Sequence, residues 1–354
     1  MFILNVFIFL CVLVYCTADC NTSVKNDHDN ILLIKNGNIL LPVDSIGTIE
    51  VPNNDIIQMA CISNPVLPMD KVPIVDAKCI GGDIYEVDSK TYAAKQLTCK
   101  TTPPPTELQS GKCLKNLYEN VNIGFQVGNT FINQINLCFD NTLKSTLYAE
   151  ALLSKKLCCC QESIRYAIYD FYAPFVLTRG HLIAMCDFIY SVQQKMTFYL
   201  INAAPQWKSF NEGNWKYLEA KVKNLVATTR SDYQVFTGTY GILQLNNTSG
   251  GKSKIYLNYN PRQGVYQMPV PLYFWKVLIN MDTKKGLAII GMNNIHEKEI
   301  DPCTNIIANI TWLQGGKWNS IRSGYTIACE INEFKNIPGL RDQLPLIPPT
   351  TGTL

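Results

Sequence analysis

The cysteines constrain this chain more than any other feature of its sequence. Fourteen cysteines occur in 354 residues, and two of them, Cys11 and Cys16, lie in an apolar stretch at the amino terminus. The small side chain of Ala18, just after that stretch, suits the cleavage site of a secretory signal, so residues 1–18 are predicted to be a signal peptide. The alternative is a membrane anchor, but the stretch is shorter than the roughly 20 residues that span a bilayer.

Removal of the signal leaves twelve cysteines, and a secreted chain forms disulfides by default. Their spacing does not match a zinc site, because there is no CxxC pair and the chain has only three histidines. Neighbouring side chains diverge, so the run Cys158-Cys159-Cys160 predicts two or three separate bridges. Four N-x-S/T sequons fit a glycosylated extracellular protein; they lie at Asn21, Asn246, Asn247 and Asn309.

Apolar patterning divides the chain into two regions. Residues 19–112 are predicted to form a small β-rich domain, because their short apolar runs are separated by turn-forming residues; the runs are 31–34, 39–43, 56–61 and 72–75. Segment 101–111, with three consecutive prolines, is predicted to be a semi-rigid linker. Longer helical and strand patterns predict an α+β domain over 113–347, and the Pro-rich tail 348–354 is predicted to be flexible.

Composition and charge narrow the class of protein. With 47% hydrophobic and 17% charged residues, the chain is too apolar for a disordered tail or a solvated coiled coil. The charge is uneven, with a net charge of −4 before residue 140 and +7 from that residue on. An anionic ligand is therefore expected to bind the second half.

One predicted helix carries two inward polar side chains. At about 100° per residue, the pattern over 211–227 places five apolar side chains on one stripe; they are Trp215, Leu218, Val222, Leu225 and Val226. Asn211 and Glu219 fall within the same arc, whereas the neighbouring lysines fall outside it. Burial of an amide or a carboxylate is costly without partners, which makes these two residues candidates for a functional role. The alternative is that Asn211 caps the helix and Glu219 lies on its flank.

The three histidines differ in their surroundings. His28 and His296 lie among polar and charged residues and are predicted to be solvated. His181 follows the apolar run 171–177 in the sequence Thr178-Arg179-Gly180-His181, where a strand is expected to end and glycine permits a tight backbone. A hydrogen-bonded structural role is the alternative for this histidine.

A second apolar strand is predicted over 198–206, with Asn202 embedded in it and Gln206 at its end, and it leads into the helix at 211–227. This order and the string TRGHL…NAAPQWKSFNEGNWKYLE resemble the DNA/RNA non-specific endonuclease family. The likeness continues at 235–238 (VFTG) and 269–277 (PVPLYFWKV), and it covers most of residues 160–345.

The resemblance implies a fold. It is that of a ββα-metal nuclease domain, with a central antiparallel sheet flanked by helices and a small β-rich domain before it. That front region is similar to the amino-terminal part of insect members that degrade double-stranded RNA.

The resemblance also implies roles for the candidate residues. His181 would be the general base that takes a proton from water, and an imidazole that titrates near neutrality suits this task. Asn211 would be the one direct protein ligand of a divalent cation, Mg²⁺ or another such as Mn²⁺. Mg²⁺ keeps most of its waters, so a single amide oxygen is a reasonable ligand. Glu219 would hold the waters of the metal.

Three further residues complete the implied site. Arg179 would bind the phosphate, while Asn202 and Gln206 would orient His181 and its neighbours by hydrogen bonds. Arg165 is a possible second phosphate contact. The sequence departs from the best-known motif of the family at Thr178, where that motif has aspartate and this chain offers only a hydroxyl.

The implied function is that of a secreted, metal-dependent endonuclease. It would cut without sequence preference, because phosphate contacts carry no base information, with double-stranded RNA favoured and DNA second. Basic residues near the helix could bind the nucleic-acid backbone; they are Lys208, Lys216, Lys221, Lys223 and Arg230. One alternative is a catalytically silent secreted nucleic-acid-binding protein that keeps the nuclease fold, for which Thr178 is the support. A structural or adhesive extracellular protein is the other.

Overall fold

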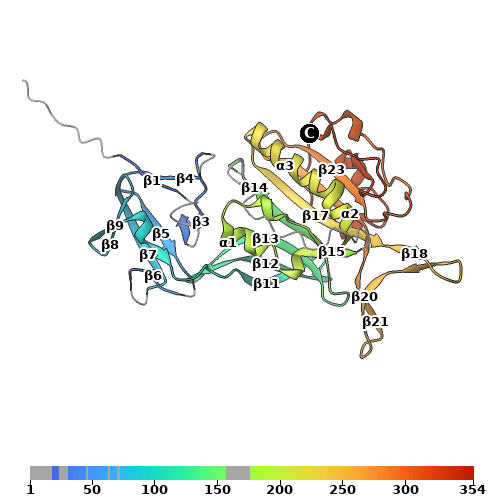
Figure 1. Cartoon of the computed structure of the whole chain (residues 1–354), viewed down its shortest axis with the longest axis horizontal. Coiled ribbons are helices and arrows are strands. Elements are labelled where there is room, and N and C mark those ends of the chain that lie inside the picture. The colour runs from blue at the N-terminus through green and yellow to red at the C-terminus, as the bar shows by residue number, and fades with distance from the viewer. Residues whose placement is uncertain (1–17, 24–30, 45–46, 63, 70–71, 157–175) are drawn as a thin grey trace, which may run out of the picture.

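The computed structural model describes residues 18–23, 31–44, 47–62, 64–69, 72–156 and 176–354 (Figure 1). Several predictions fall outside these residues. They concern the signal peptide apart from residue 18, His28, the cysteines at 158–160 and Arg165. The disulfide prediction is confirmed at four described pairs, which are Cys20–Cys79, Cys61–Cys99, Cys113–Cys138 and Cys303–Cys329.

The front region is built from short strands, as its sequence predicts. Six of them form an antiparallel sheet in the order β3-β2-β5-β7-β8-β9, and β1–β4 and β6–β10 form two-stranded pairs. The bounds are β1 Cys20–Ser23, β2 Leu32–Lys35, β3 Asn38–Ile39, β4 Thr48–Val51, β5 Ile56–Ala60, β6 Val66–Leu67, β7 Ile74–Gly81, β8 Ile84–Val87, β9 Lys90–Ala93 and β10 Thr98–Cys99. The run at 39–43 is the exception, because only its first residue belongs to a strand.

A nine-stranded sheet organises the rest of the described chain. Its order is β11-β12-β13-β14-β17-β22-β23-β24, all antiparallel, and β25 adds to β23 in parallel. The bounds are β11 Thr106–Cys113, β12 Tyr118–Val127, β13 Thr130–Asp140, β14 Ser145–Leu153, β17 Tyr233–Ile242, β22 Pro271–Asn280, β23 Lys285–Met292, β24 Thr326–Cys329 and β25 Gly352–Thr353.

Two predictions at the edges of this sheet are wrong. Most of the expected linker 101–111 is a strand, because β11 starts directly after the three prolines and pairs with β12. The tail 348–354 is not a free end: β25 pairs with β23, and the Thr351 N–H donates to the Lys284 carbonyl at 3.0 Å. Pairing with another strand decides both cases.

The helices are few and short. Their bounds are α1 Ser191–Met196, α2 Lys208–Phe210, α3 Lys216–Thr229 and α4 Ile331–Phe334. The helix predicted over 211–227 is confirmed, and it extends over α2, a wide turn at Asn211–Trp215, and α3. Within the described part of the chain, none of these helices has the length and apolar content to cross a membrane.

The strands β22 and β23 are buried on both faces, so the sheet separates two apolar cores. On β22, Phe274 and Leu278 pack with the apolar stripe of α3, whereas Trp275 and Val277 pack with α4 and the C-terminal segment. Lys276 points to the same side as Phe274, because side chains alternate along a strand. The predicted fold, a central antiparallel sheet flanked by helices and preceded by a β-rich region, is therefore confirmed.

Three smaller features complete the molecule. A two-stranded ribbon, β15 Leu177–His181 and β16 Ala203–Trp207, lies beside the sheet. Two hairpins project from the body (Figure 1); one joins β18 Gln244–Asn246 to β19 Lys252–Lys254, and the other joins β20 Tyr256–Asn260 to β21 Val265–Pro269. The front region contacts the second half through the buried Tyr190, whose hydroxyl donates to the Leu40 carbonyl.

Candidate active site

The ribbon of β15 and β16 carries three of the predicted site residues, Arg179, His181 and Gln206, together with Thr178. Thr178 lies opposite Gln206 and His181 lies opposite Ala203 in the antiparallel register. Because side chains alternate along a strand, Arg179 and His181 share one face of β15 and Thr178 lies on the other. The strand predicted to end at His181 is confirmed, but the strand predicted over 198–206 begins only at Ala203, because Leu200–Asn202 form a 3-10 turn.

Gly180 is required by close packing within the ribbon. A Cβ atom at this position would lie 2.2 Å from Oε1 and 2.7 Å from Cβ of Gln206, which is fully buried. Neither polar atom of the Gln206 amide has a hydrogen-bond partner among the described residues. The Gln206 side chain therefore does not form the hydrogen bond that was expected to orient His181. Its backbone carbonyl instead accepts a hydrogen bond from the Thr178 hydroxyl.

Asn202 fixes the segment that follows His181. Its buried amide donates to the carbonyls of Ile183 and Thr197, both at 2.9 Å, and accepts from the Ile183 N–H at 3.0 Å. Its own carbonyl accepts from the Leu182 N–H at 2.9 Å. Asn202 therefore forms hydrogen bonds with residues that neighbour His181, as expected from the sequence.

His181 is largely removed from water, and burial lowers the pKa of its imidazole. The ring meets Phe198 edge to face, with ring centroids 5.2 Å apart. Arg179, two residues earlier on the same face, is exposed. A neutral imidazole beside an exposed guanidinium can accept a proton next to a bound anion.

Asn211 is positioned by the wide turn between α2 and α3. Gly213 has a non-helical backbone there (φ −93°, ψ −119°), and a Cβ on it would lie 2.8 Å from the Ser323 carbonyl. The turn brings the Asn211 amide to β15, where Nδ2 donates to Thr178 Oγ1 at 3.1 Å. The helix and the strand that carries His181 are thus joined by a direct hydrogen bond.

The Thr178 hydroxyl determines which way the Asn211 amide faces. Its one proton is donated to the Gln206 carbonyl at 3.0 Å, so toward Asn211 it can only accept. The amide therefore presents Nδ2 to Thr178 and turns Oδ1 away. Among the described residues, Oδ1 receives no hydrogen bond.

Three charged side chains gather beneath α3. Burial raises the pKa of Glu219 to about 7, with Lys276 opposing this rise and Asp187 adding to it. Burial also lowers the pKa of Lys276 and raises that of Asp187. The Lys276 ammonium donates to Thr237 Oγ1 at 2.6 Å and to the Leu182 carbonyl at 3.4 Å, next to His181. Lys276 on β22 thus links the central sheet to the segment after His181 and to Glu219 on α3.

Lys276 and Asp187 were not among the predicted site residues. Lys276 carried a usable signal, because it is the one charged residue in the apolar run 269–280, and a lone charge in a buried strand needs partners. Asp187 carried no such signal; its burial results from the turn that follows Ala184, whose N–H donates to the Asp187 carboxylate at 3.0 Å.

The site has groups that fit a hydrated divalent cation. Asn211 Oδ1 is an oxygen acceptor without a donor among the described residues, and Glu219 accepts no hydrogen bond in the same part of the chain. A neutral amide oxygen and a carboxylate suit a cation that keeps most of its waters. No three His, Cys, Asp or Glu side chains in the described ranges gather as a metal-binding group.

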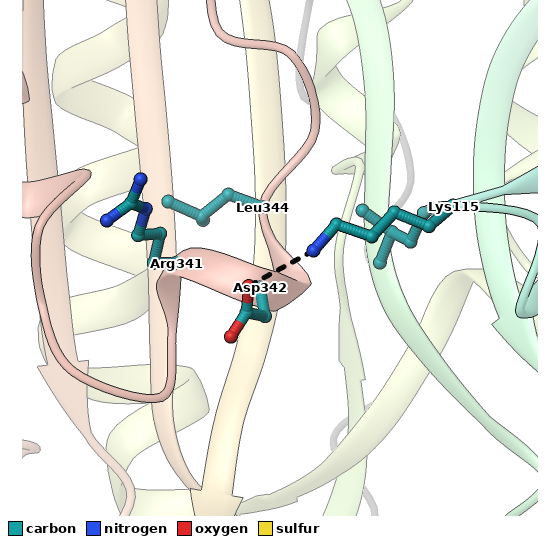
Figure 2. Close-up of a pocket in the computed structure, with 5 residues that line it drawn as sticks. Lys115, Arg341, Asp342 and Leu344 are labelled. Carbon is teal, nitrogen blue, oxygen red and sulfur yellow. Dashed lines mark ion pairs between the residues drawn. The ribbon is translucent and has the colours of Figure 1, made fainter.

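His296 and one surface hollow are not parts of this candidate site. His296 meets Trp207 edge to face, with centroids 5.7 Å apart. A surface hollow of about 440 Å³ lies where the turn after β11 meets the C-terminal segment (Figure 2). There Lys115 and Asp342 form an exposed ion pair at 3.5 Å, which contributes little to stability. None of the predicted site residues lines this hollow.

Comparison with known proteins identifies relatives of the second half. The DNA/RNA non-specific endonuclease family matches residues 159–334. The salivary endonuclease of Lutzomyia longipalpis is 33% identical over 161 residues, which are 45% of this chain and 38% of that protein. Mitochondrial endonuclease G of Homo sapiens is 38% identical over 103 residues, which are 28% of this chain and 32% of that protein. These matches span less than half of the length of either relative.

A crystal structure of the EndoG/EndoGI complex aligns with a TM-score of 0.38 and 19% identity, over 60% of this chain and 84% of that one. The family match is the informative result, because residues 159–334 include every predicted site residue. The second half of this chain, over residues 159–334, therefore matches the DNA/RNA non-specific endonuclease family.

Proposed function

We propose that this protein is a secreted, metal-dependent endonuclease that hydrolyses phosphodiester bonds in nucleic acid without sequence preference. One observation carries the proposal. The hydrogen bond from Asn211 Nδ2 to Thr178 Oγ1 joins the helix that offers a metal ligand to the strand that offers a base and a phosphate-binding cation. The family match supports the nuclease chemistry.

His181 is the general base in this proposal. Its lowered pKa keeps the imidazole neutral near neutral pH, so it can accept a proton from the attacking water. Contact with the edge of Phe198 and the hydrogen bonds of Asn202 to the following residues hold the ring and its backbone. Arg179, exposed on the same face, binds the phosphate.

Asn211 would hold a divalent cation, Mg²⁺ or Mn²⁺, through Oδ1, and Glu219 would accept hydrogen bonds from the waters of the ion. Such a cation, when bound, stabilises negative charge on the phosphate and the leaving oxygen. Thr178 keeps Oδ1 turned outward, and Lys276 balances the charge of Glu219. These residues therefore prepare the site before the ion arrives.

The substrate and the location are also proposals. Recognition through phosphates gives no base preference, and the resemblance of the front region favours double-stranded RNA, with DNA second. Four disulfides support an extracellular location, as does similarity to a relative named as salivary. The side chains of the four sequon asparagines are exposed, which suits glycosylation.

A cleavage assay tests the proposed function. Plasmid DNA, long duplex RNA and single strands are incubated with the protein at fixed salt, with Mg²⁺, with Mn²⁺ or with EDTA. We expect cutting that EDTA abolishes, fastest on duplex RNA, and its loss in His181→Ala with nucleic-acid binding retained. Binding without cutting in the wild type would instead identify a silent nucleic-acid-binding protein.

A further inference from the structure

The hairpin of β20 and β21 presents an exposed aromatic and apolar face. Leu257, Tyr259, Tyr266 and Met268 lie on this side of the hairpin, and we call them the hairpin face. Tyr259 and Tyr266 lie opposite each other in the register, with ring centroids 4.9 Å apart, and are 49% and 59% exposed. Exposed patches of large apolar side chains mark interaction sites more often than chance.

The hairpin is anchored, although a two-stranded hairpin is only marginally stable alone. Its buried Gln267 donates to the Thr142 carbonyl at 2.9 Å, and the Met268 N–H donates to the Leu143 carbonyl at 2.7 Å. Met268 has a φ of +54°, which is uncommon for a residue with a side chain. The backbone is thus held in a conformation that leaves the hairpin face in solvent.

The hairpin face continues into a pocket beside the candidate active site. The pocket has a volume of about 780 Å³, which is within the range of small-molecule sites. Leu257 and Met268 line it from the hairpin, Arg179 lines it from β15, and the exposed Leu200 lines it from the 3-10 turn before β16. Arg179 is the proposed phosphate-binding residue, so the pocket adjoins the position of the cut strand.

Charge around the pocket favours a polyanion. Among the residues that the structure describes, Lys144 and Arg179 are the charged ones that line it, and no acidic side chain does. The sequence between Asp232 and Asp282, which contains both projecting hairpins, has no Asp or Glu. A binding site for a protein does not require such an excess of positive charge, whereas a binding site for a phosphodiester strand does.

We propose that the hairpin face and this pocket bind unpaired nucleobases of the strand whose phosphate lies at Arg179. The inference rests on the proposed function and adds a substrate feature to it. Tyrosine rings stack on bases of any sequence, because every base has a π face, and nearby cations bind the backbone. In a fully paired duplex the bases stack on each other, so the hairpin face serves strand ends, loops and bulges.

Binding in EDTA tests this inference without any cleavage. Fluorescence anisotropy would measure the affinity of the full-length protein for a short single strand, for the same strand with abasic sites, and for a blunt duplex. The variant Tyr259→Ala/Tyr266→Ala is compared with Tyr259→Phe/Tyr266→Phe, which keeps both rings. Leu117→Ala is the control for an exposed apolar side chain elsewhere, since Leu117 is 70% exposed and lies outside the pocket.

We expect the alanine variant to lose about five- to 100-fold in single-strand affinity for each stacked ring. The phenylalanine variant and Leu117→Ala should bind as the wild type does, and duplex binding should not change. The wild type should bind the abasic strand as weakly as the alanine variant binds the normal strand. Unchanged thermal unfolding would show that the variants fold.

Two results would overturn the inference. One is equal affinity of the wild type for the normal and the abasic strand. The other is a change in self-association of the alanine variant with no change in single-strand binding, which would make the hairpin face a contact between protein copies. A wild type that binds strands through the hairpin but cuts nothing with Mg²⁺ would contradict only the proposed function, so the two failures are distinguishable.

Discussion

At the scale of single residues, Thr178 shows how a neutral group can take a position where the family motif has aspartate. Its hydroxyl accepts from Asn211 and donates to the Gln206 carbonyl, and a carboxylate could not do both. The hydroxyl therefore orients the proposed metal ligand Asn211 without adding charge. We infer that this residue prepares the metal site rather than weakening it.

Replacement of this hydroxyl gives the first prediction. Thr178→Val keeps the shape but frees the Asn211 amide to rotate, so we expect the Mg²⁺ concentration for half-maximal thermal stabilisation to rise about five-fold, the equivalent of one hydrogen bond. Thr178→Ser should behave as the wild type. Equal metal dependence of the valine variant and the wild type would remove Thr178 from this role.

The half-buried side chain of Glu219 gives a prediction about pH. Its folded-state pKa of about 7 lies above the ordinary value of 4.5, so the folded protein holds a proton that the unfolded chain has lost. The contribution of this group to the free energy of unfolding is therefore most favourable below about pH 4.5, and it is lost as the pH rises to about 7. In EDTA, urea unfolding should show the wild type losing up to about 3 kcal/mol relative to Glu219→Gln across this range. A constant difference between the two proteins would contradict the raised pKa.

The sequence predicts the identity of the site residues better than their contacts. The inward position of Asn211 and Glu219 follows from helical periodicity, which is a local property. The partners of these residues lie far away in the chain, as Thr178 and Lys276 do, and no local pattern specifies them. The amide of Gln206, which has no partner in the described part of the chain, shows the same limit, since its expected hydrogen bond required a geometry that the register of β15 and β16 does not provide.

At the scale of elements, apolar periodicity predicts the long helix but not the wide turn within it. That turn depends on the Ser323 backbone, which approaches Gly213 from a distant segment. The strand at 198–206 is shorter than expected, because Asn202 uses its hydrogen bonds on the segment after His181 and leaves the strand pattern. Tertiary contacts thus set the boundaries of elements whose type the sequence predicts.

The ribbon of β15 and β16 gives a prediction at this scale. Gly180→Ala should place a methyl group against the buried Gln206 side chain and lower the free energy of unfolding by about 1–3 kcal/mol, the usual cost of overpacking. Gln206→Ala in the same protein should recover part of this loss, because the clash with Oε1 disappears. Chemical denaturation of the single and double variants measures the coupling, and additive effects would exclude this contact as the cause.

At the scale of the whole molecule, the two halves differ in net charge and contact each other. The front sheet contacts the second half through Tyr190 and Leu40, and Tyr199 donates to the Pro105 carbonyl at 2.8 Å. The sequence predicts both regions and the net charges of −4 and +7. It does not predict these contacts, nor the pairing of β25, because each joins segments that are remote in the chain.

Salt dependence gives a prediction that distinguishes the two halves. Each lysine that neutralises a phosphate releases counterions, so nucleic-acid affinity should fall as salt rises, and removal of such a lysine should reduce the logarithmic slope by about 1. We expect a lower slope when Lys216, Lys221 and Lys223 on α3 are changed to glutamine, measured in EDTA. The matched changes at Lys90, Lys95 and Lys100 in the front region should leave the slope unaltered. Equal slopes for both triple variants would place the phosphate contacts elsewhere, because both variants remove three lysines but from different surfaces.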